Sequence, residues 1–147
     1  GTKLAEYYFR GGYPQLSQEE VLDYCADALC RCHHAGVRVI RLGLHDTPSL
    51  REHLLAGYFH PAYGELAESR LYLRQLKAAA ADCGKTELFV ETAPRTMSKV
   101  LGQHGCNRKA LAEQGVSLRV RENAAVAAGT LLAGQQVYEI FSERNQR

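Results

Sequence analysis

The stretch Ser98-Lys-Val-Leu-Gly-Gln-His-Gly-Cys-Asn-Arg-Lys-Ala-Leu-Ala-Glu113 predicts two short helices joined by a tight loop at residues 102–105. A run typical of a strand, Thr86-Glu-Leu-Phe-Val-Glu-Thr-Ala93, precedes this stretch, and Pro94 ends it. Another such run, Val116-Ser-Leu-Arg-Val-Arg-Glu122, follows. We therefore expect strand, helix, Gly-x-x-Gly loop, helix and strand in that order between about residues 86 and 122.

This order is that of the minimal KH motif, in which the Gly-x-x-Gly loop clamps a nucleic-acid backbone. Glycines let backbone N–H groups come close to a phosphate because no Cβ stands in the way. A second interpretation is equally open: Gly102 ends one helix, Asn107 caps the next, and nothing is bound. The candidate nucleic-acid-binding residues are Lys99, Gly102, Gln103, His104, Gly105, Arg108 and Lys109.

The net charge of +2 is distributed unevenly along the chain. The window from Pro94 to Arg121 carries a net charge of +5, and the remainder carries −3. A basic surface around the loop favours a polyanionic partner, although a solvated surface is the commoner explanation of charge runs. The basic residues of this window are Arg95, Lys99, Arg108, Lys109, Arg119 and Arg121.

The composition is that of a globular chain, with 147 residues, 46% hydrophobic and 23% charged. This length predicts one domain or two small ones. No apolar run is long enough to span a bilayer, and the N-terminus lacks a signal-peptide pattern. Five cysteines without a regular framework indicate reduced thiols and a cytoplasmic location. The absence of an initial methionine fits a fragment of a longer protein.

The N-terminal half begins with two predicted helices. The first covers residues 4–10 and the second runs from a capping box at Ser17 and Glu20 to about residue 34. Gly36 is expected to end the second helix. Its predicted buried face consists of Val21, Cys25, Ala28 and Cys32, with Leu22 and Leu29 beside them.

Residues 37–44, Val-Arg-Val-Ile-Arg-Leu-Gly-Leu, form the strongest strand pattern in the sequence. A helix followed by such a strand predicts an α/β unit with a parallel sheet. His45, Asp46 and Thr47 would then lie at the carboxyl end of the strand, where ligands bind in α/β folds. A helix that begins at Asp46 or Thr47 with Pro48 explains these residues as well.

The remaining segments predict a loop, a long helix and a last strand. Residues 56–64 are rich in glycine and aromatic residues, and a helix should follow from about 65 to 82, ended by Gly84. Its predicted buried stripe is Leu66, Ser69, Leu73, Leu76 and Ala80. Residues 123–134 suggest no regular structure, and residues 136–141 are expected to form a strand.

Two other groups of residues have chemical and structural interpretations. Cys30 and His34 are four residues apart, as in a zinc pair, but no second pair has a usual spacing, so a buried structural cysteine is expected. His60 and Glu65 could act as acid or base, although a role at the start of the following helix is favoured. We therefore expect no metal and no catalytic residue in this chain.

Several segments resemble the end of a radical SAM core and the domain that follows it. The resemblance is to the bacterial branch similar to the elongator catalytic subunit and to oxygen-independent coproporphyrinogen III oxidase. It rests mainly on residues 36–44 and on His60-Pro-Ala-Tyr-Gly-Glu-Leu-Ala-Glu-Ser-Arg70. Further segments that carry it are 1–8, 13–20, 98–103 and 107–111.

The resemblance implies a C-terminal portion of a larger enzyme. Residues 1–48 would be the incomplete tail of a radical SAM barrel, made of helix–strand units. Residues 49–147 would be an α+β domain that is KH-like from about 86 to 122. The Cys-x-x-x-Cys-x-x-Cys motif that holds the iron–sulfur cluster is absent from the sequence. We therefore expect no cofactor on this fragment, whereas the parent protein is implied to use a [4Fe–4S] cluster and S-adenosylmethionine.

Two functions follow from these expectations. In the first, the chain is the non-catalytic C-terminal region of a radical SAM oxidoreductase, which helps to close the barrel and to bind a substrate such as tRNA. Its partners would be the N-terminal core and tRNA or another RNA, with no membrane. In the alternative, the chain is a stand-alone KH-like RNA-binding module without enzymatic activity.

Overall fold

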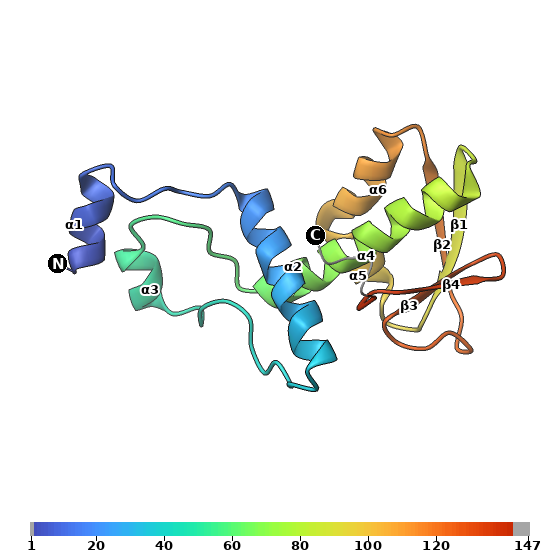
Figure 1. Cartoon of the computed structure of the whole chain (residues 1–147), viewed down its shortest axis with the longest axis horizontal. Coiled ribbons are helices and arrows are strands. Elements are labelled where there is room, and N and C mark those ends of the chain that lie inside the picture. Colours follow the sequence, from blue (N-terminus) through green and yellow to red (C-terminus); the bar gives the residue numbers. More distant parts are fainter. Residues whose placement is uncertain (1, 143–147) are drawn as a thin grey trace.

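A four-stranded mixed sheet occupies one end of the molecule, as Figure 1 shows for the computed structural model, which describes residues 2–142. The strand order is β2-β1-β3-β4, with β1 and β2 parallel and the other neighbours antiparallel. The strands are β1 (Glu87–Thr92), β2 (Ser117–Glu122), β3 (Thr130–Ala133) and β4 (Gln136–Glu139). The helices are α1 (Lys3–Phe9), α2 (Gln18–His34), α3 (Pro48–His53), α4 (Tyr63–Cys83), α5 (Met97–Leu101), the 3₁₀ turn η1 (Gln103–Gly105) and α6 (Cys106–Ala112).

The parallel pair β1 and β2 requires a crossover, which α5, η1 and α6 provide. Leu88, Val90 and Thr92 of β1 are buried on one face of the sheet, as their alternation predicts. Thus a mixed α/β fold with an open sheet is confirmed. β3 lies in the segment for which the sequence suggested no structure, and β4 confirms the predicted last strand.

α4 is the central helix, because it packs against α2 on one side and against α5, α6 and the sheet on the other (Figure 1). The predicted helix is confirmed, and it begins two residues earlier, at Tyr63. Gly84 ends it in the left-handed conformation with φ of 61°. Four of its five predicted stripe residues are buried, and Leu66 is partly exposed. Leu71, Tyr72 and Gln75 are buried as well, since the helix is covered on two sides.

α2 begins at the predicted capping box. Ser17 Oγ accepts from Glu20 N at 3.2 Å, and Glu20 Oε2 accepts from Ser17 N at 2.7 Å. The predicted buried face is wrong by about one position, because Ala28 is exposed while Ala26 and Cys30 are buried. The neighbouring row of α2 contains Asp23 and Asp27, which pair with Arg74 of α4 at 2.8 and 2.5 Å. These ion pairs orient α2, so Ala26 and Cys30 point toward α4.

The end of the described chain closes over the C-terminal part of α2. The ring of Phe141 stacks on His33 with 4.2 Å between centroids, and its carbonyl oxygen lies 2.5 Å from His34 Nε2. The Sγ of Cys30 is 4.0 Å from the carbonyl oxygen of Ile140, so this thiol is a structural one. α2 therefore shares one hydrophobic core with the C-terminal strands. A domain division at residue 48 stays a prediction.

Residues 37–44 do not form the predicted strand. This segment is irregular and exposed, and Ile40 retains 90% and Leu44 63% of their accessible surface. A strand needs a neighbour for its N–H and C=O groups, and none of the four strands within residues 2–142 pairs with this segment. The α/β unit with a parallel sheet in residues 1–48 is therefore wrong for this chain.

Residues 45–47 consequently lie at a helix start rather than at the end of a strand. Thr47 Oγ1 accepts from Leu50 N at 3.1 Å and Pro48 is the first residue of α3. Asp46 Oδ1 accepts from Arg51 Nε at 2.7 Å, and this hydrogen bond lowers the pKa of Asp46. The helix-start interpretation is confirmed.

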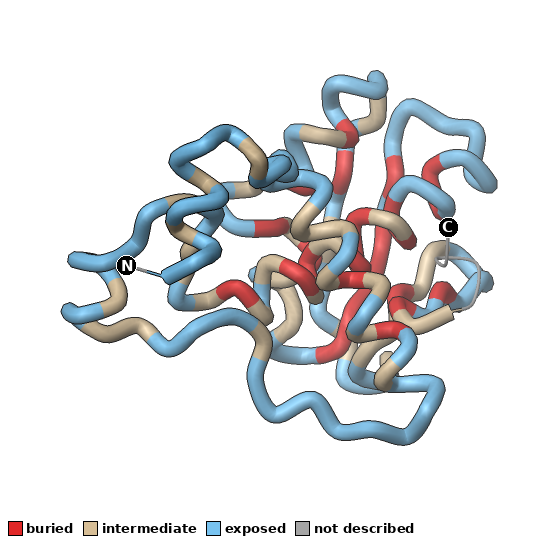
Figure 2. Tube along the Cα trace, turned by 60° about the vertical axis from the view of Figure 1, so that its left-hand side comes forward, coloured by how far each residue is buried: buried red, intermediate tan, exposed pale blue. Residues whose placement is uncertain are grey.

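Burial differs sharply between the two halves of the chain. Figure 2 shows buried residues gathered around α4 and the sheet, whereas the N-terminal segments are mostly exposed. Of the fifteen exposed large hydrophobic side chains in residues 2–142, thirteen lie between Leu4 and Tyr58. None of the helices in the described part of the chain is long and apolar enough to cross a membrane.

Candidate nucleic-acid interface

The loop between α5 and α6 has an unusual backbone at three positions. Gly102 has φ of 76° and ψ of 161°, and His104 and Gly105 have φ of 52° and 72°. A Cβ at Gly102 would lie 2.4 Å from Cys106 Sγ, while a Cβ at Gly105 would meet nothing within 4 Å. Gly102 is therefore a packed helix C-cap, as the structural interpretation predicts, and only Gly105 offers open space for a ligand.

The two glycines should differ in their effect on stability. Replacement of Gly102 by alanine is expected to lower the free energy of unfolding by about 2 kcal/mol, because strain and a clash add up. Gly105→Ala should cost about 1 kcal/mol, from the left-handed backbone alone. Urea denaturation of the two variants checks this order, and equal losses would contradict the assigned packing at Gly102.

Asn107 fixes the loop to the core. Its side chain is 2% exposed, and Nδ2 donates to Ser69 O and Val100 O, each at 3.0 Å. Ser69 Oγ lies at 3.0 Å and Lys99 O at 3.3 Å from the same nitrogen. The predicted N-cap role of Asn107 is wrong, because Gly105 precedes the first turn of α6 and Asn107 lies inside it. Its amide instead donates to carbonyl groups of Lys99 and Val100 in the last turn of α5, which lack helical partners there, and to Ser69 in the interior of α4.

His60 connects the loop to the start of α4. Its Nδ1 accepts from Ala62 N at 3.1 Å, which confirms the helix-start role. Its Nε2 is 3.2 Å from Nε2 of Gln103. Because Nδ1 is an acceptor, Nε2 carries the hydrogen of the neutral ring, and the Gln103 amide oxygen is the atom that should face it. Glu65 lies in the first turn of α4, where a carboxylate complements the helix dipole.

Lys99 is not available as a free cation. Its Nζ pairs with Oε2 of Glu68, a residue of α4. Burial of the ammonium group lowers the pKa of Lys99, but the hydrogen bond and charge of Glu68 outweigh it and raise the pKa above its usual value. A phosphate that contacts Lys99 would have to replace this carboxylate.

Two further basic residues of the window are paired across the parallel strands. Arg119 Nε lies 2.5 Å from Glu87 Oε1, and Arg121 pairs with Glu91. Their carboxylates and Glu68 lie outside the window of net charge +5, so that count overstated the positive charge of the surface. The β1–β2 register could have predicted the strand pairs. Of the six basic residues in this window, Arg95, Arg108 and Lys109 have no side-chain ion pair with a carboxylate among residues 2–142.

A cavity of about 220 Å³ lies between the loop and α4. The polar side chains of its lining include hydrogen-bond donors, such as Lys99, and acceptors, such as the carboxylate of Glu65. Of the predicted binding residues, Lys99, Gly102, Gln103 and His104 line it, whereas Arg108 and Lys109 are exposed on α6. The complete lining is Ala62, Glu65, Leu66, Ser69, Ser98, Lys99, Gly102, Gln103 and His104.

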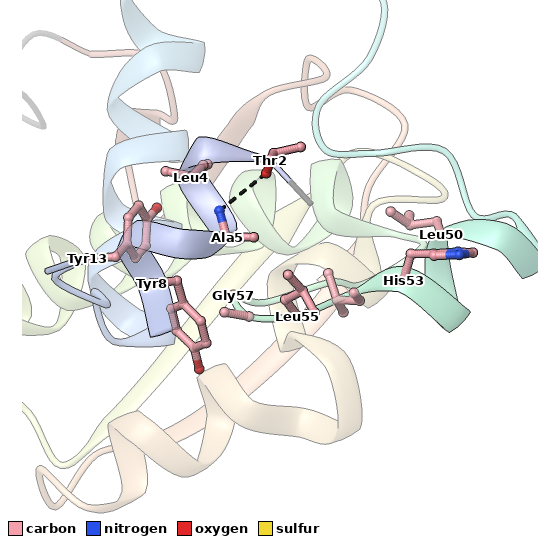
Figure 3. Close-up of a pocket in the computed structure, with 11 residues that line it drawn as sticks. Thr2, Leu4, Ala5, Tyr8, Tyr13, Leu50, His53, Leu55 and Gly57 are labelled. Atoms are coloured by element: carbon pink, nitrogen blue, oxygen red, sulfur yellow. Dashed lines mark hydrogen bonds between the residues drawn. The ribbon is translucent and has the colours of Figure 1, made fainter. Parts of the chain in front are cut away.

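A second cavity, of about 250 Å³, lies between α1 and the segment around α3 (Figure 3). Figure 3 shows Tyr8 of α1 and Leu55 on opposite sides of it, and Thr2 capping α1 through Ala5 N at 3.2 Å. Sequence reasoning did not find this cavity, because its two sides are about fifty residues apart in the chain. Its lining is Thr2, Leu4, Ala5, Tyr8, Tyr13, Leu50, His53, Leu54, Leu55, Ala56 and Gly57.

Residues 2–142 contain no group of three or more His, Cys, Asp or Glu side chains that could hold a metal ion. Cys25, Cys30 and Cys32 lie on α2, while Cys83 and Cys106 lie on other helices, and all five thiols are free. These residues do not fit a [4Fe–4S] cluster, which needs thiolates gathered at one point.

One protein-family model matches the N-terminal part of the chain. Residues 1–73 match the family model of the radical SAM C-terminal domain, and this match covers α1, α2, α3 and the first half of α4. No curated protein and no solved structure gives a significant match. The resemblance to a radical SAM protein is thus supported over residues 1–73, and the narrower branch stays a prediction.

Proposed function

We propose that this chain is a non-catalytic C-terminal region of a radical SAM iron–sulfur oxidoreductase. In this proposal residues 1–73 pack against the preceding core and help to close its barrel. Such a core supplies the [4Fe–4S] cluster and S-adenosylmethionine, and residues 2–142 offer no ligand set for the cluster. The role of this chain is therefore to shape and bind, not to perform the reaction.

The concentration of exposed apolar side chains in the matched region is the observation that carries this proposal. Thirteen large hydrophobic residues between Leu4 and Tyr58 remain exposed, against two in the sheet, Phe89 and Val137. A surface of this kind is unfavourable in water unless another surface covers it. The match to a radical SAM C-terminal domain supports a radical SAM core as the surface that would cover these side chains.

A comparison of the 147-residue chain with the longer protein tests this packing. Ile40→Asp should leave the 147-residue chain unchanged within about 0.5 kcal/mol, because the side chain is 90% exposed. In the longer protein the same change should cost about 2 kcal/mol, since it would bury a charge. Urea denaturation measures both values.

Val137→Asp is the matched control, as Val137 is exposed on the sheet outside the matched region and should be neutral in both proteins. An equal effect of Ile40→Asp in both proteins would argue for the alternative, a stand-alone KH-like module. The coding sequence upstream gives an independent check, because without a Cys-x-x-x-Cys-x-x-Cys motif the enzyme assignment fails.

We further propose that the loop at residues 102–105 and α6 contact the substrate, an RNA of the tRNA class. The order β1, α5, loop, α6, β2 supports a KH-like interpretation, in which the loop clamps RNA backbone. Support also comes from the open space at Gly105 and from the exposed Arg108 and Lys109 beside it. Lys99 contributes less, because Glu68 neutralises it.

The salt dependence of tRNA binding tests the second proposal. Arg108→Ala and Lys109→Ala should each flatten the slope of log affinity against log salt by about 0.7 to 0.9, one released counterion per contact. Lys99→Ala should change the slope less. Arg119→Ala is the control, because Arg119 is paired with Glu87 and lies on the face of the sheet away from the helices. Unchanged slopes for Arg108→Ala and Lys109→Ala would remove the loop and α6 from RNA binding.

A further inference from the structure

We propose that a cavity at the junction of α2 and α4 binds a small neutral ring compound through a hydrogen-bond acceptor on that compound. The cavity has a volume of about 240 Å³, and its lining shares Leu54, Ala56 and Gly57 with the cavity in Figure 3. Its lining is Val21, Cys25, Gly43, Leu44, Leu54, Ala56, Gly57, Tyr58, Phe59, His60 and Tyr63. This site contains no residue of the 102–105 loop, and it is tested on the 147-residue chain because Leu44, Leu54 and Tyr58 of its lining belong to the exposed apolar surface of the proposed function.

The hydroxyl group of Tyr63 is the feature that points to a ligand. Tyr63 is 5% exposed, and its Oη has no hydrogen-bond partner among residues 2–142. A buried hydroxyl without a partner is costly, so such groups are rare in folded proteins. Tyr63 lines the cavity, and an acceptor atom placed there would complete its hydrogen bonding.

The backbone around Tyr63 holds its ring in place. Tyr63 is the first residue of α4, and its N–H donates to His60 O at 3.2 Å. Gly43 has φ of 84°, and a Cβ there would lie 3.0 Å from the Cβ of Tyr63. The chain therefore passes close to this tyrosine only because residue 43 is glycine.

The lining selects a neutral ligand. Among its residues there is no Asp, Glu, Lys or Arg, and both ring nitrogens of its one histidine, His60, contact Ala62 or Gln103 instead. Burial raises the pKa of Tyr63, with Cys25 and Tyr58 adding to the rise, and burial also raises the pKa of the Cys25 thiol. These groups are therefore uncharged at neutral pH and can donate hydrogen bonds, while neither could balance a ligand charge.

The volume sets the size of the ligand. An apolar cavity of about 150 Å³ in a protein is known to accept benzene. A volume of about 240 Å³ therefore accommodates one substituted ring with a polar group of one or two heavy atoms. A single ring that carries a carbonyl group fits both the volume and the hydroxyl of Tyr63.

The test compares acetophenone with ethylbenzene, which has a ring and side chain of similar size but no acceptor. Binding to the 147-residue chain is followed by the amide NMR shifts of residues 43, 58 and 63. We expect acetophenone to bind about fivefold more tightly than ethylbenzene, the effect of one hydrogen bond. In Tyr63→Phe this preference should disappear, with ethylbenzene affinity unchanged.

Two further variants locate the binding. Tyr8→Phe changes a tyrosine of the neighbouring cavity and should keep the preference for acetophenone. Val21→Phe places a ring inside the proposed cavity and should abolish binding of both compounds. Equal affinities of the two compounds for the unaltered chain, no binding of either, or a preference that persists in Tyr63→Phe would each overturn the proposal.

Discussion

Asn107→Asp is expected to lower the free energy of unfolding by about 4 kcal/mol. The Nδ2 of Asn107 lies within 3.0 Å of Ser69 O and Val100 O, so a carboxylate at this position would face two carbonyl oxygens. Because the side chain is 2% exposed, water cannot solvate the new charge. Chemical denaturation at neutral pH measures the loss.

The loss should be smaller at about pH 3 than at pH 7. A buried carboxyl group that faces oxygens has a folded-state pKa above its unfolded value of about 3.9. Folding therefore favours the protonated form of Asp at position 107. The free energy of unfolding of the variant falls as the pH rises above the unfolded-state pKa. Arg108→Ala changes the next, exposed residue of α6 and should cost less than about 0.5 kcal/mol. Equal losses for Asn107→Asp and Arg108→Ala would contradict the assigned role of the buried Asn107 hydrogen bonds.

Leu71→Ala should lower the free energy of unfolding by about 3 kcal/mol. Leu71 is fully buried in α4, in contact with the core that joins α2 and the sheet, so the truncation leaves a cavity. Leu55→Ala is the matched control, because the same atoms are removed from a side chain that is exposed in this structure. A loss at Leu55 as large as that at Leu71 would show that the N-terminal segments have a core of their own.

Elements with a complete local signal could be predicted from the sequence. The capping box at Ser17, the glycine stop at Gly84 and the alternation of residues 86–93 each specify structure through neighbours in the chain. Residues 37–44 have an equally good pattern, but a strand also needs a partner that residues 2–142 do not provide. The sequence pattern shows that the segment is suited to a strand, but it does not show whether a partner strand is present.

The position of the candidate site could be predicted from the sequence, but the charges and hydrogen bonds around it could not. The loop and its two helices follow from Gly102 and Gly105. The charges that face the loop do not, because Glu68 comes from a helix about thirty residues earlier and cancels Lys99. Asn107 was assigned to a helix start because Asn is common there, although its partners are main-chain groups of two other helices. Such contacts depend on tertiary packing, which no local pattern encodes.

The stacking of Phe141 on His33 has a consequence for biosynthesis. The residues that close over α2 are separated from it by more than one hundred positions. During translation α2 leaves the ribosome more than one hundred residues before Ile140 and Phe141, so its contacts with them are missing in the interval. The part of the core that joins α2 to Tyr138 and Ile140 can therefore form only after these residues have been synthesised, and until then Ala26 and Cys30 lack these contacts. Contacts of this range also slow folding, so the time of exposure is set by both synthesis and loop closure.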